Sequence, residues 1–350
     1  MLKDIESKSQ IIKNFSPAWF ASVMGTGVLA NGSYMYSDRL SVLKDMGNIL
    51  FYFNVILFII LLIPWTLRWL FFKKQAISDL EHPINSNFYA TMAIAILVLS
   101  SNFTVIGKNT DIARILWIIG VPLTIFFAVF TPYIMFKTEN TKIGHITPSW
   151  FIPPVGLIVI PLAGAPIMNT FTGSAYDLAV FINYFSWGSG FFLYISLLAI
   201  SVYRMILHQP LPSQLAPTIW INLGPIGAGA ASLISLIAVT SFITVKEPLY
   251  VFALIFWGSG IWWIMMSVAL TVHYIRRLKL PYALSWWAFT FPIGAYVAGS
   301  HSVSKIFNIK LFDDIGFLMY WLLLFIWSLT LYYTAIHTYH GTHFREVKNG

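Results

Sequence analysis

Long apolar stretches without charged residues alternate with short polar segments along the whole chain. Each stretch is long enough for the roughly 20 residues that a helix needs to cross the hydrocarbon layer of a membrane. The pattern predicts an all-α integral membrane protein with ten transmembrane helices in a single domain, residues 1–350, with short termini at about 1–15 and 338–350. The predicted spans are 16–36, 46–67, 86–107, 115–136, 148–169, 178–203, 217–244, 248–272, 282–304 and 315–336.

A weak sequence repeat marks the odd-numbered spans. In each of them an aromatic residue is followed five positions later by Gly, Ala or Pro. The aromatic residues lie 68, 63, 69 and 67 positions apart, in the pairs Phe20 and Gly25, Phe88 and Ala93, Phe151 and Gly156, Trp220 and Pro225, and Trp287 and Pro292. Repetition at the length of a two-helix unit is typical of arrays of such units. We therefore expect five helical hairpins in a quasi-fivefold arrangement around a central pore.

The even-numbered spans are more uniformly apolar and carry a second repeat. FSWGSGFF around Trp187 and IFWGSGIW around Trp257 lie 70 positions apart, in the sixth and eighth predicted spans. Glycines in such motifs allow neighbouring membrane helices to approach closely. We expect the odd spans to face inward and the even spans to face outward.

Composition and charge support this interpretation and suggest an orientation. Only 10% of the residues are charged and 58% are hydrophobic, whereas soluble domains carry about 25% charge. The side that holds both termini carries Lys or Arg at positions 3, 8, 13, 68, 73, 74, 137, 142, 204, 276, 277, 279, 345 and 348, against 39, 44, 108, 114, 246, 305 and 310 on the other side. The positive-inside rule then predicts a multi-pass plasma-membrane protein with cytoplasmic termini.

The net charge of +8 does not indicate a nucleic-acid partner, because it falls almost wholly on the predicted cytoplasmic side. Membrane topology and attraction to the anionic lipid bilayer explain it. A positive vestibule that concentrates anions is the alternative explanation.

The predicted spans contain no Asp, Glu, Lys or Arg away from their ends, and the chain has no Cys. Ion-coupled carriers usually place an ionisable residue near the membrane midplane, so this pattern favours a passive conduit. Ser189 and Ser259 lack a His at membrane depth that could activate them, so no enzyme is predicted. We also predict no cofactor and no metal, and interpret His337, His340 and His343 as a solvated tail.

One layer of residues is predicted to line the pore at mid-membrane. The position four residues after each aromatic anchor falls on the same helix face. These positions are Met24, Met92, Val155, Gly224 and Phe291. Phe291 is the one large, rigid side chain among them, and it could close the pore as a hydrophobic gate. Packing of Phe291 between helices is the alternative.

Prolines within the odd spans remove backbone hydrogen bonds and are expected to kink the helices. The predicted kinks are at Pro154, Pro225 and Pro292.

Two motifs identify a family resemblance that covers the whole chain. FSPAWFASVMGTG in the first span and SWWAFTFPIG in the ninth resemble the tellurite-resistance/dicarboxylate transporter family, which includes bacterial tellurite-resistance proteins, fungal malate permeases and sulfite efflux pumps, and plant guard-cell slow anion channels. The resemblance implies a homotrimer in which each protomer has its own pore, closed by a phenylalanine on the ninth helix. That residue corresponds to Phe291, with Phe289 as the alternative.

The expected function is a passive anion channel or channel-like uniporter for small anions such as chloride, nitrate, sulfite or a malate-like anion. A pore without a buried Lys or Arg suits monovalent anions better than dianions. The alternatives are a coupled transporter of C4-dicarboxylate (malate) or sulfite, and a membrane sensor or scaffold with a sealed pore.

Overall fold

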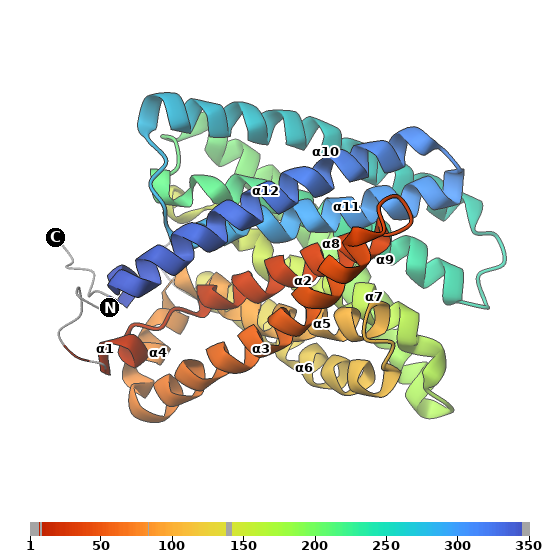
Figure 1. Ribbon diagram of the computed structural model, residues 1–350, viewed down its shortest axis with the longest axis horizontal. Helices are drawn as coiled ribbons and strands as arrows, with labels where there is room; N and C mark the ends of the chain where they lie inside the picture. Colours follow the sequence, from red (N-terminus) through yellow and green to blue (C-terminus); the bar gives the residue numbers. More distant parts are fainter. Residues whose placement is uncertain (1–6, 8, 83, 138–141, 345–350) are drawn as a thin grey trace.

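A computed structural model describes Ser7 and residues 9–82, 84–137 and 142–344. The regular structure of these residues is entirely helical, as predicted (Figure 1). Four of the cations that entered the predicted orientation, Lys3, Lys8, Arg345 and Lys348, lie outside the described residues, as do parts of both predicted terminal segments.

The α-helices are α1 (Ser9–Lys13), α2 (Phe20–Met35), α3 (Val42–Phe71), α4 (Lys73–Glu81), α5 (Asn85–Val105), α6 (Thr110–Lys137), α7 (Ile152–Gly164), α8 (Ser174–Leu207), α9 (Leu223–Val239), α10 (Glu247–His273), α11 (Trp287–Phe307) and α12 (Lys310–His340). Shorter 3₁₀ or π segments are η1 (Pro17–Trp19), η2 (Ile143–His145), η3 (Pro148–Phe151), η4 (Ala165–Thr170), η5 (Ser213–Asn222), η6 (Tyr274–Leu278), η7 (Leu284–Trp286) and η8 (Thr342–Phe344).

Eight helices of the described chain are long and apolar enough to cross a membrane. They coincide with eight of the ten predicted spans. The other two predicted spans, 16–36 and 282–304, coincide with α2 and α11. Helix α2 has only 16 residues, and the C-terminal part of α11 contains the polar sequence SHSVSK, which lowers its mean hydropathy.

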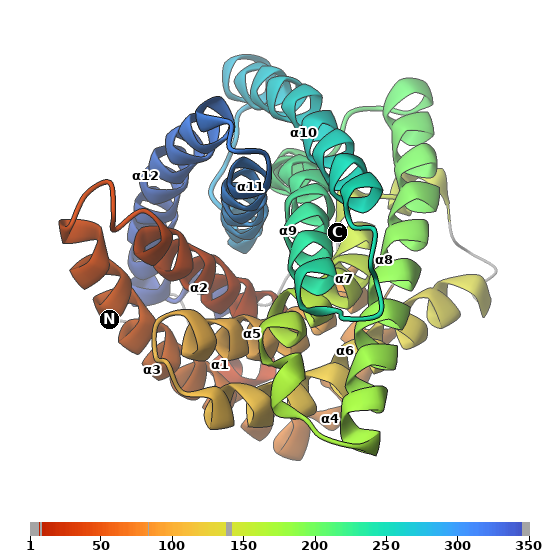
Figure 2. The same cartoon turned by 90° about the vertical axis from the view of Figure 1, so that its right-hand side faces the viewer.

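The helices form an inner and an outer layer (Figure 2). Helices α2, α5, α7, α9 and α11 form the inner layer, in which each helix contacts the next and α11 contacts α2 again. In the apolar windows of α5, α7 and α9, 72–89% of the residues are buried, against 22–39% for the outer α3, α6, α8, α10 and α12. The outer helices expose apolar side chains such as Phe192, Ile206 and Leu318. A lipid environment suits this surface.

Each outer helix is hydrogen-bonded to the inner helix that follows it in the chain, and α12 is bonded back to α2. In four of these five links a tryptophan Nε1 donates. The links are Trp117 to Ile160 O, Trp187 to Gly229 O, Trp257 to Ser300 Oγ and Trp327 to Thr26 Oγ1, at 3.0, 3.1, 2.9 and 3.0 Å. The tryptophans lie 70 positions apart, which extends the repeat seen at Trp187 and Trp257. In α3 the donor is instead Asn54, which bonds to Asn102 on α5.

In each GSG motif only the second glycine packs closely against a neighbouring helix. A β-carbon at Gly190 would lie 2.9 Å from the Pro154 carbonyl oxygen, and one at Gly260 would overlap the Tyr296 ring. At Gly188 and Gly258 a β-carbon would have no atom within 4 Å. Close helix packing within the chain therefore explains the second glycine of each motif but not the first.

The three prolines predicted to kink helices occupy different positions. Pro154 and Pro225 lie in the first turns of α7 and α9, directly after the 3₁₀ segments η3 and η5. In a first turn the proline removes no hydrogen bond from the helix interior. Pro292 lies within α11 and is the one of the three that interrupts an established helix.

Candidate functional site

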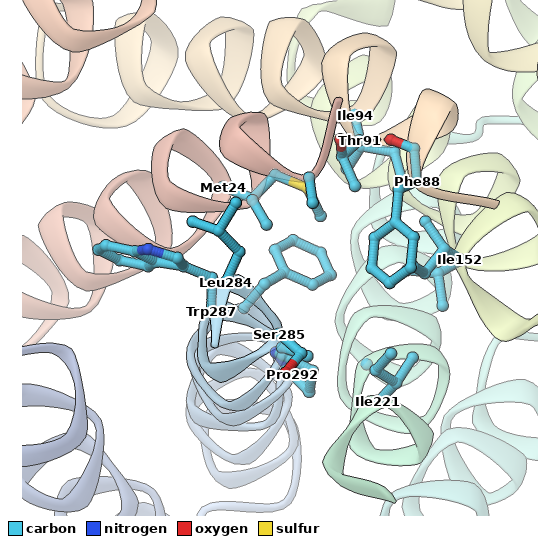
Figure 3. A pocket seen from close by; sticks show the side chains of 16 residues that line it. Met24, Phe88, Thr91, Ile94, Ile152, Ile221, Leu284, Ser285, Trp287 and Pro292 are labelled. Carbon is cyan, nitrogen blue, oxygen red and sulfur yellow. Dashed lines mark hydrogen bonds between the residues drawn. The ribbon is translucent and has the colours of Figure 1, made fainter. Parts of the chain in front are cut away.

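A small cavity lies between the inner helices, near the ends at which they begin (Figure 3). We call it the proximal cavity, and its volume is about 40 Å³. All five inner helices or the 3₁₀ segments before them contribute to its apolar wall. The lining residues are Ala18, Ala21, Met24, Phe88, Thr91, Ile94, Ile152, Val155, Ile221, Gly224, Leu284, Ser285, Trp287, Ala288, Phe291 and Pro292.

A second cavity lies further along the same five helices. We call it the distal cavity, and its volume is about 170 Å³. It is less apolar, because hydroxyl and amide groups face it. The lining residues are Val28, Asn31, Gly32, Met35, Val98, Ser101, Val105, Val159, Leu162, Ala163, Pro166, Ala231, Ser235, Phe291, Gly294, Ala295, Ala298 and Ser302.

Phe291 is the one residue that lines both cavities. Its side chain is only 4% exposed. A β-carbon at Gly224 would lie 3.7 Å from Phe291 Cε1 and 3.7 Å from Val155 Cγ2, so the ring is close to α7 and α9 as well as to its own helix. The position of Phe291 between two cavities is what a blocking side chain requires.

The structure brings together four of the five residues that were predicted to form one layer. Met24, Val155, Gly224 and Phe291 all line the proximal cavity. Met92 is not among the lining residues, and Ile94 of the same helix takes that place.

The difference in α5 is a shift of two residues in the repeat. The wall of α2 contains residues 21, 24, 28, 31 and 35, and the wall of α5 contains 91, 94, 98, 101 and 105, each 70 positions later. The counterpart of Phe20 is therefore the buried Ala90 and not Phe88. The aromatic side chain of Phe88 suggested the wrong register.

The alternative gate residue, Phe289, lies elsewhere. Its ring packs against Trp220 and Trp286, with centroid distances of 5.9 and 6.1 Å, and it lines neither cavity. This arrangement makes Phe289 a packing residue at the junction of η5, η7 and α11.

A third, wider opening lies beyond the distal cavity and shares Met35 with it. We call it the distal vestibule; its volume is about 490 Å³, and its wall consists of Tyr34, Met35, Ser37, Asp38, Ser41, Lys44, His301 and Lys305. Lys44 and Lys305 are exposed cations, against one carboxylate, Asp38, in the same wall. The positive vestibule considered from the charge distribution would lie at the opposite end of the molecule, on the side of the termini.

A network of charged groups borders the vestibule. His301 Nδ1 lies 2.9 Å from Asp313 Oδ1, and Arg39 Nη2 lies 2.5 Å from Asp313 Oδ2 and 2.8 Å from Asp314 Oδ1. The carboxylates of α12 are thus engaged by Arg39 and His301.

The residues that line the proximal and distal cavities include no Asp, Glu, Lys, Arg or His. Among the described residues, no group of three His, Cys, Asp or Glu side chains is arranged to hold a metal ion. His337 and His343 lie 5.6 Å apart as rings, whereas His340 packs on Tyr339 instead. What the two cavities offer a solute is therefore apolar surface and a few neutral hydrogen-bonding groups.

Comparisons of the sequence with known proteins identify a family model and several transporters that are similar to this chain. A family model described as voltage-dependent anion channel matches residues 14–335. An uncharacterized transporter of Methanocaldococcus jannaschii is 54% identical over 99% of each chain. A sulfite efflux pump of Arthroderma otae is 27% identical over 87% of this chain and 86% of its own length. A malic acid transport protein of Schizosaccharomyces pombe is 23% identical over 93% of this chain and 78% of its own length.

Proposed function

We propose, from the premise that this chain belongs to the voltage-dependent anion channel family, that it is a passive channel or channel-like uniporter for small anions. The permeating ion would pass from the proximal cavity to the distal cavity and vestibule. Phe291 would close the path between the two cavities. Chloride, nitrate, sulfite and a malate-like anion are the ions to compare.

The single observation that carries this proposal is the position of the Phe291 ring. Both cavities have walls from all five inner helices, and this side chain borders both. A hydrophobic constriction in a channel blocks ions sterically and by excluding water. Displacement of one ring would join the cavities.

The proposed architecture extends the observed contacts into a pore. We take α2 and α11 as membrane spans too, which makes ten spans, or five hairpins in a quasi-fivefold ring and a single domain. The closed circuit of contacts among the inner helices supports this ring. Cytoplasmic termini in the plasma membrane follow from the distribution of Lys and Arg. A homotrimer in the lipid bilayer, and a link to tellurite resistance, rest on the family resemblance alone.

Passive flow is favoured because the cavity walls carry no ionisable group. A carrier that couples substrate movement to protons or ions generally needs such a group near its binding site. Two exposed lysines in the distal vestibule would raise the local anion concentration without holding an ion tightly.

The test is a flux assay on purified protein in liposomes, comparing wild type, Phe291→Ala and Phe289→Ala. The two variants remove the same atoms from the same helix, but only Phe291 borders the cavities. We expect Phe291→Ala to raise chloride and nitrate flux, and Phe289→Ala to leave it near the wild-type level. Equal flux in all three proteins, each shown to be inserted, would exclude Phe291 as the gate.

A coupled transporter of sulfite or C4-dicarboxylate is the second candidate. The similarity to the sulfite efflux pump of Arthroderma otae and to the malic acid transport protein of Schizosaccharomyces pombe favours it. The His301 and Asp313 pair beside the vestibule could bind a proton during transport. Sulfite or malate uptake that requires a proton gradient, and that His301→Gln makes independent of the gradient, would support this candidate over a passive channel.

A further inference from the structure

Four neutral side chains form a hydrogen-bonded chain from the outer helix α3 to the distal cavity. Asn54 Nδ2 donates to Asn102 Oδ1 at 3.1 Å, Asn102 Nδ2 donates to Asn31 Oδ1 at 2.8 Å, and Asn31 Nδ2 donates to Ser101 Oγ at 3.1 Å. Asn54 and Asn102 are completely buried. Asn31 and Ser101 line the cavity. This series of hydrogen bonds therefore starts in the protein interior and ends at the cavity wall.

The backbone of Gly27 determines the direction of this chain. Its carbonyl oxygen lies 2.9 Å from Asn102 Nδ2, and because a carbonyl can only accept, the nitrogen of that amide must face it. The oxygen of Asn102 then faces Asn54 and must receive a donor. The second hydrogen of Asn102 Nδ2 goes to Asn31, whose oxygen is turned away from Ser101. Any flipped amide would place two acceptors or two donors together.

The consequence is that two donor hydrogens are left for the cavity, whereas both oxygens of the pair already accept a hydrogen bond. Ser101 Oγ already accepts from Asn31, so its hydroxyl hydrogen is available. Asn31 Nδ2 carries a second hydrogen beyond the one given to Ser101. Asn31 Oδ1 is occupied by Asn102. This part of the wall thus presents the positive ends of two dipoles.

The first hairpin departs from the other four in the residue that begins this chain. Asn54 makes the outer-to-inner hydrogen bond that tryptophans make in the other four outer helices, whereas the position 70 residues before Trp117 is Gly47. Asn54 Oδ1 has no hydrogen-bond partner, and an unpaired buried acceptor costs about 1–3 kcal/mol. A β-carbon at Gly27 would come within 2.8 Å of Asn54 Nδ2 and 2.9 Å of Asn102 Oδ1, so only glycine leaves room for the network.

We propose that Asn31 and Ser101 form a binding site for one small monovalent anion in the distal cavity, and that Asn102 and Asn54 are positioning residues. The ligand class is a halide or small oxoanion such as nitrate. Two neutral donors can replace part of the hydration of a single charge, but they do not offset the desolvation of a dianion. A cation would meet only the second lone pairs of Ser101 Oγ and Asn31 Oδ1, since each oxygen already accepts one hydrogen bond. The helices α7, α9 and α11 add apolar residues such as Leu162, Ala231 and Ala298 to the wall, and the hydroxyl groups of Ser235 and Ser302.

The inference rests on the proposed function, because the site matters for permeation only if ions enter the distal cavity. The experiment therefore uses Phe291→Ala protein in planar bilayers or liposomes. The readouts are the chloride-to-potassium and nitrate-to-malate permeability ratios, taken from reversal potentials. A merely structural role for these residues would lower protein yield or melting temperature and leave these ratios unchanged.

Ser101→Ala is the central variant and Ser100→Ala is its matched control. Ser100 precedes Ser101, but its Oγ donates to Ala113 O on α6 at 2.7 Å and faces away from the cavity. We expect Ser101→Ala to lower the chloride-to-potassium ratio roughly tenfold, as loss of one hydrogen bond to a charged ligand would. Ser101→Thr keeps the hydroxyl and should keep the ratio, and Ser100→Ala should have no effect on it.

Asn31→Asp tests the direction of the donors. An aspartate can accept from Asn102 but cannot donate to Ser101, and it adds a negative charge to the cavity wall. We expect it to reduce the chloride-to-potassium ratio more than Ser101→Ala does. Asn102→Leu should lower the ratio in the same direction by releasing Asn31.

The possible outcomes separate the two proposals. Absence of anion flux in Phe291→Ala itself would contradict the proposed function. Anion flux with unchanged ratios in Ser101→Ala, relative to Ser100→Ala, would overturn the binding site and leave the channel intact. If Asn31→Asp does not insert, the three serine variants still decide the question.

Discussion

The ring of Phe291 lies beside the backbone of Gly224, so that a β-carbon at Gly224 would be 3.7 Å from Phe291 Cε1. The same β-carbon would be 3.7 Å from Val155 Cγ2, which is an ordinary van der Waals distance. Gly224 therefore provides free space next to the proposed gate. This space can be filled by a methyl group without displacing a neighbour.

Gly224→Ala is the first prediction that follows from this contact. In Phe291→Ala protein the added methyl should lower anion flux, by roughly threefold, because it narrows the cavity at the level of the missing ring. The free energy of unfolding should change by less than about 0.5 kcal/mol. Liposome flux and thermal unfolding measure the two effects.

Gly227→Ala serves as the contrasting variant for this prediction. Its β-carbon would overlap the backbone of Ala295 and Tyr296 where α9 and α11 touch. We expect a clear loss of thermal stability from Gly227→Ala. Equal stability of the two alanine variants would contradict the observed packing.

The register of α5 gives a second prediction. Ile94 lines the proximal cavity and Met92 does not. In wild-type protein, Ile94→Ala should increase anion flux because it widens the wall opposite Phe291, whereas Met92→Ala should not. Flux measured at equal protein density compares them. A larger effect of Met92→Ala than of Ile94→Ala would contradict the observed register of α5 and support the one that the aromatic residues had suggested.

The charge of the distal vestibule gives a third prediction. Replacing Lys44 and Lys305 by Gln should reduce anion entry from the distal side at low ionic strength, since the vestibule loses both exposed cations. The difference from wild type should shrink near 1 M salt, where the screening length is only about 3 Å. Lys246→Gln is the control, because this lysine lies outside the vestibule and its Nζ contacts the Ala238 carbonyl oxygen.

A fourth prediction concerns the stability of the proximal end as pH is lowered. His343 in η8 lies between Trp19 and Tyr282, with ring distances of 5.3 and 5.6 Å. Burial, together with the nearby His337, lowers the pKa of His343 to about 4 from the ordinary value of 6.5. Between these two values the unfolded chain binds the proton and the folded chain does not.

The free energy of unfolding is therefore not reduced by His343 above about pH 6.5. As the pH falls from 6.5 toward 4, it decreases by at most about 3 kcal/mol. Thermal unfolding between pH 4 and pH 8 measures this change. His343→Phe should flatten the dependence, whereas His340→Phe, at an exposed position, should not. An unchanged pH profile in His343→Phe would show that another group controls it.

The family assignment could be made from short motifs. FSPAWFASVMGTG and SWWAFTFPIG indicated a family of anion transporters, and the match over residues 14–335 confirms that prediction. Such motifs are readable because small and aromatic residues at fixed spacing are needed for the inner helices to approach each other. They do not distinguish a passive channel from a coupled carrier.

The helical membrane character and the buried inner helices were determined by the sequence itself, because the length of an apolar segment and its share of small residues act locally along one helix. The tertiary structure alone decided the register of α5, since that depends on which face packs against α2 and α6. It also decided the direction of the Asn54, Asn102 and Asn31 chain. That direction depends on the carbonyl of Gly27, which is 75 positions away from Asn102 and can be identified as its partner only when the helices are packed.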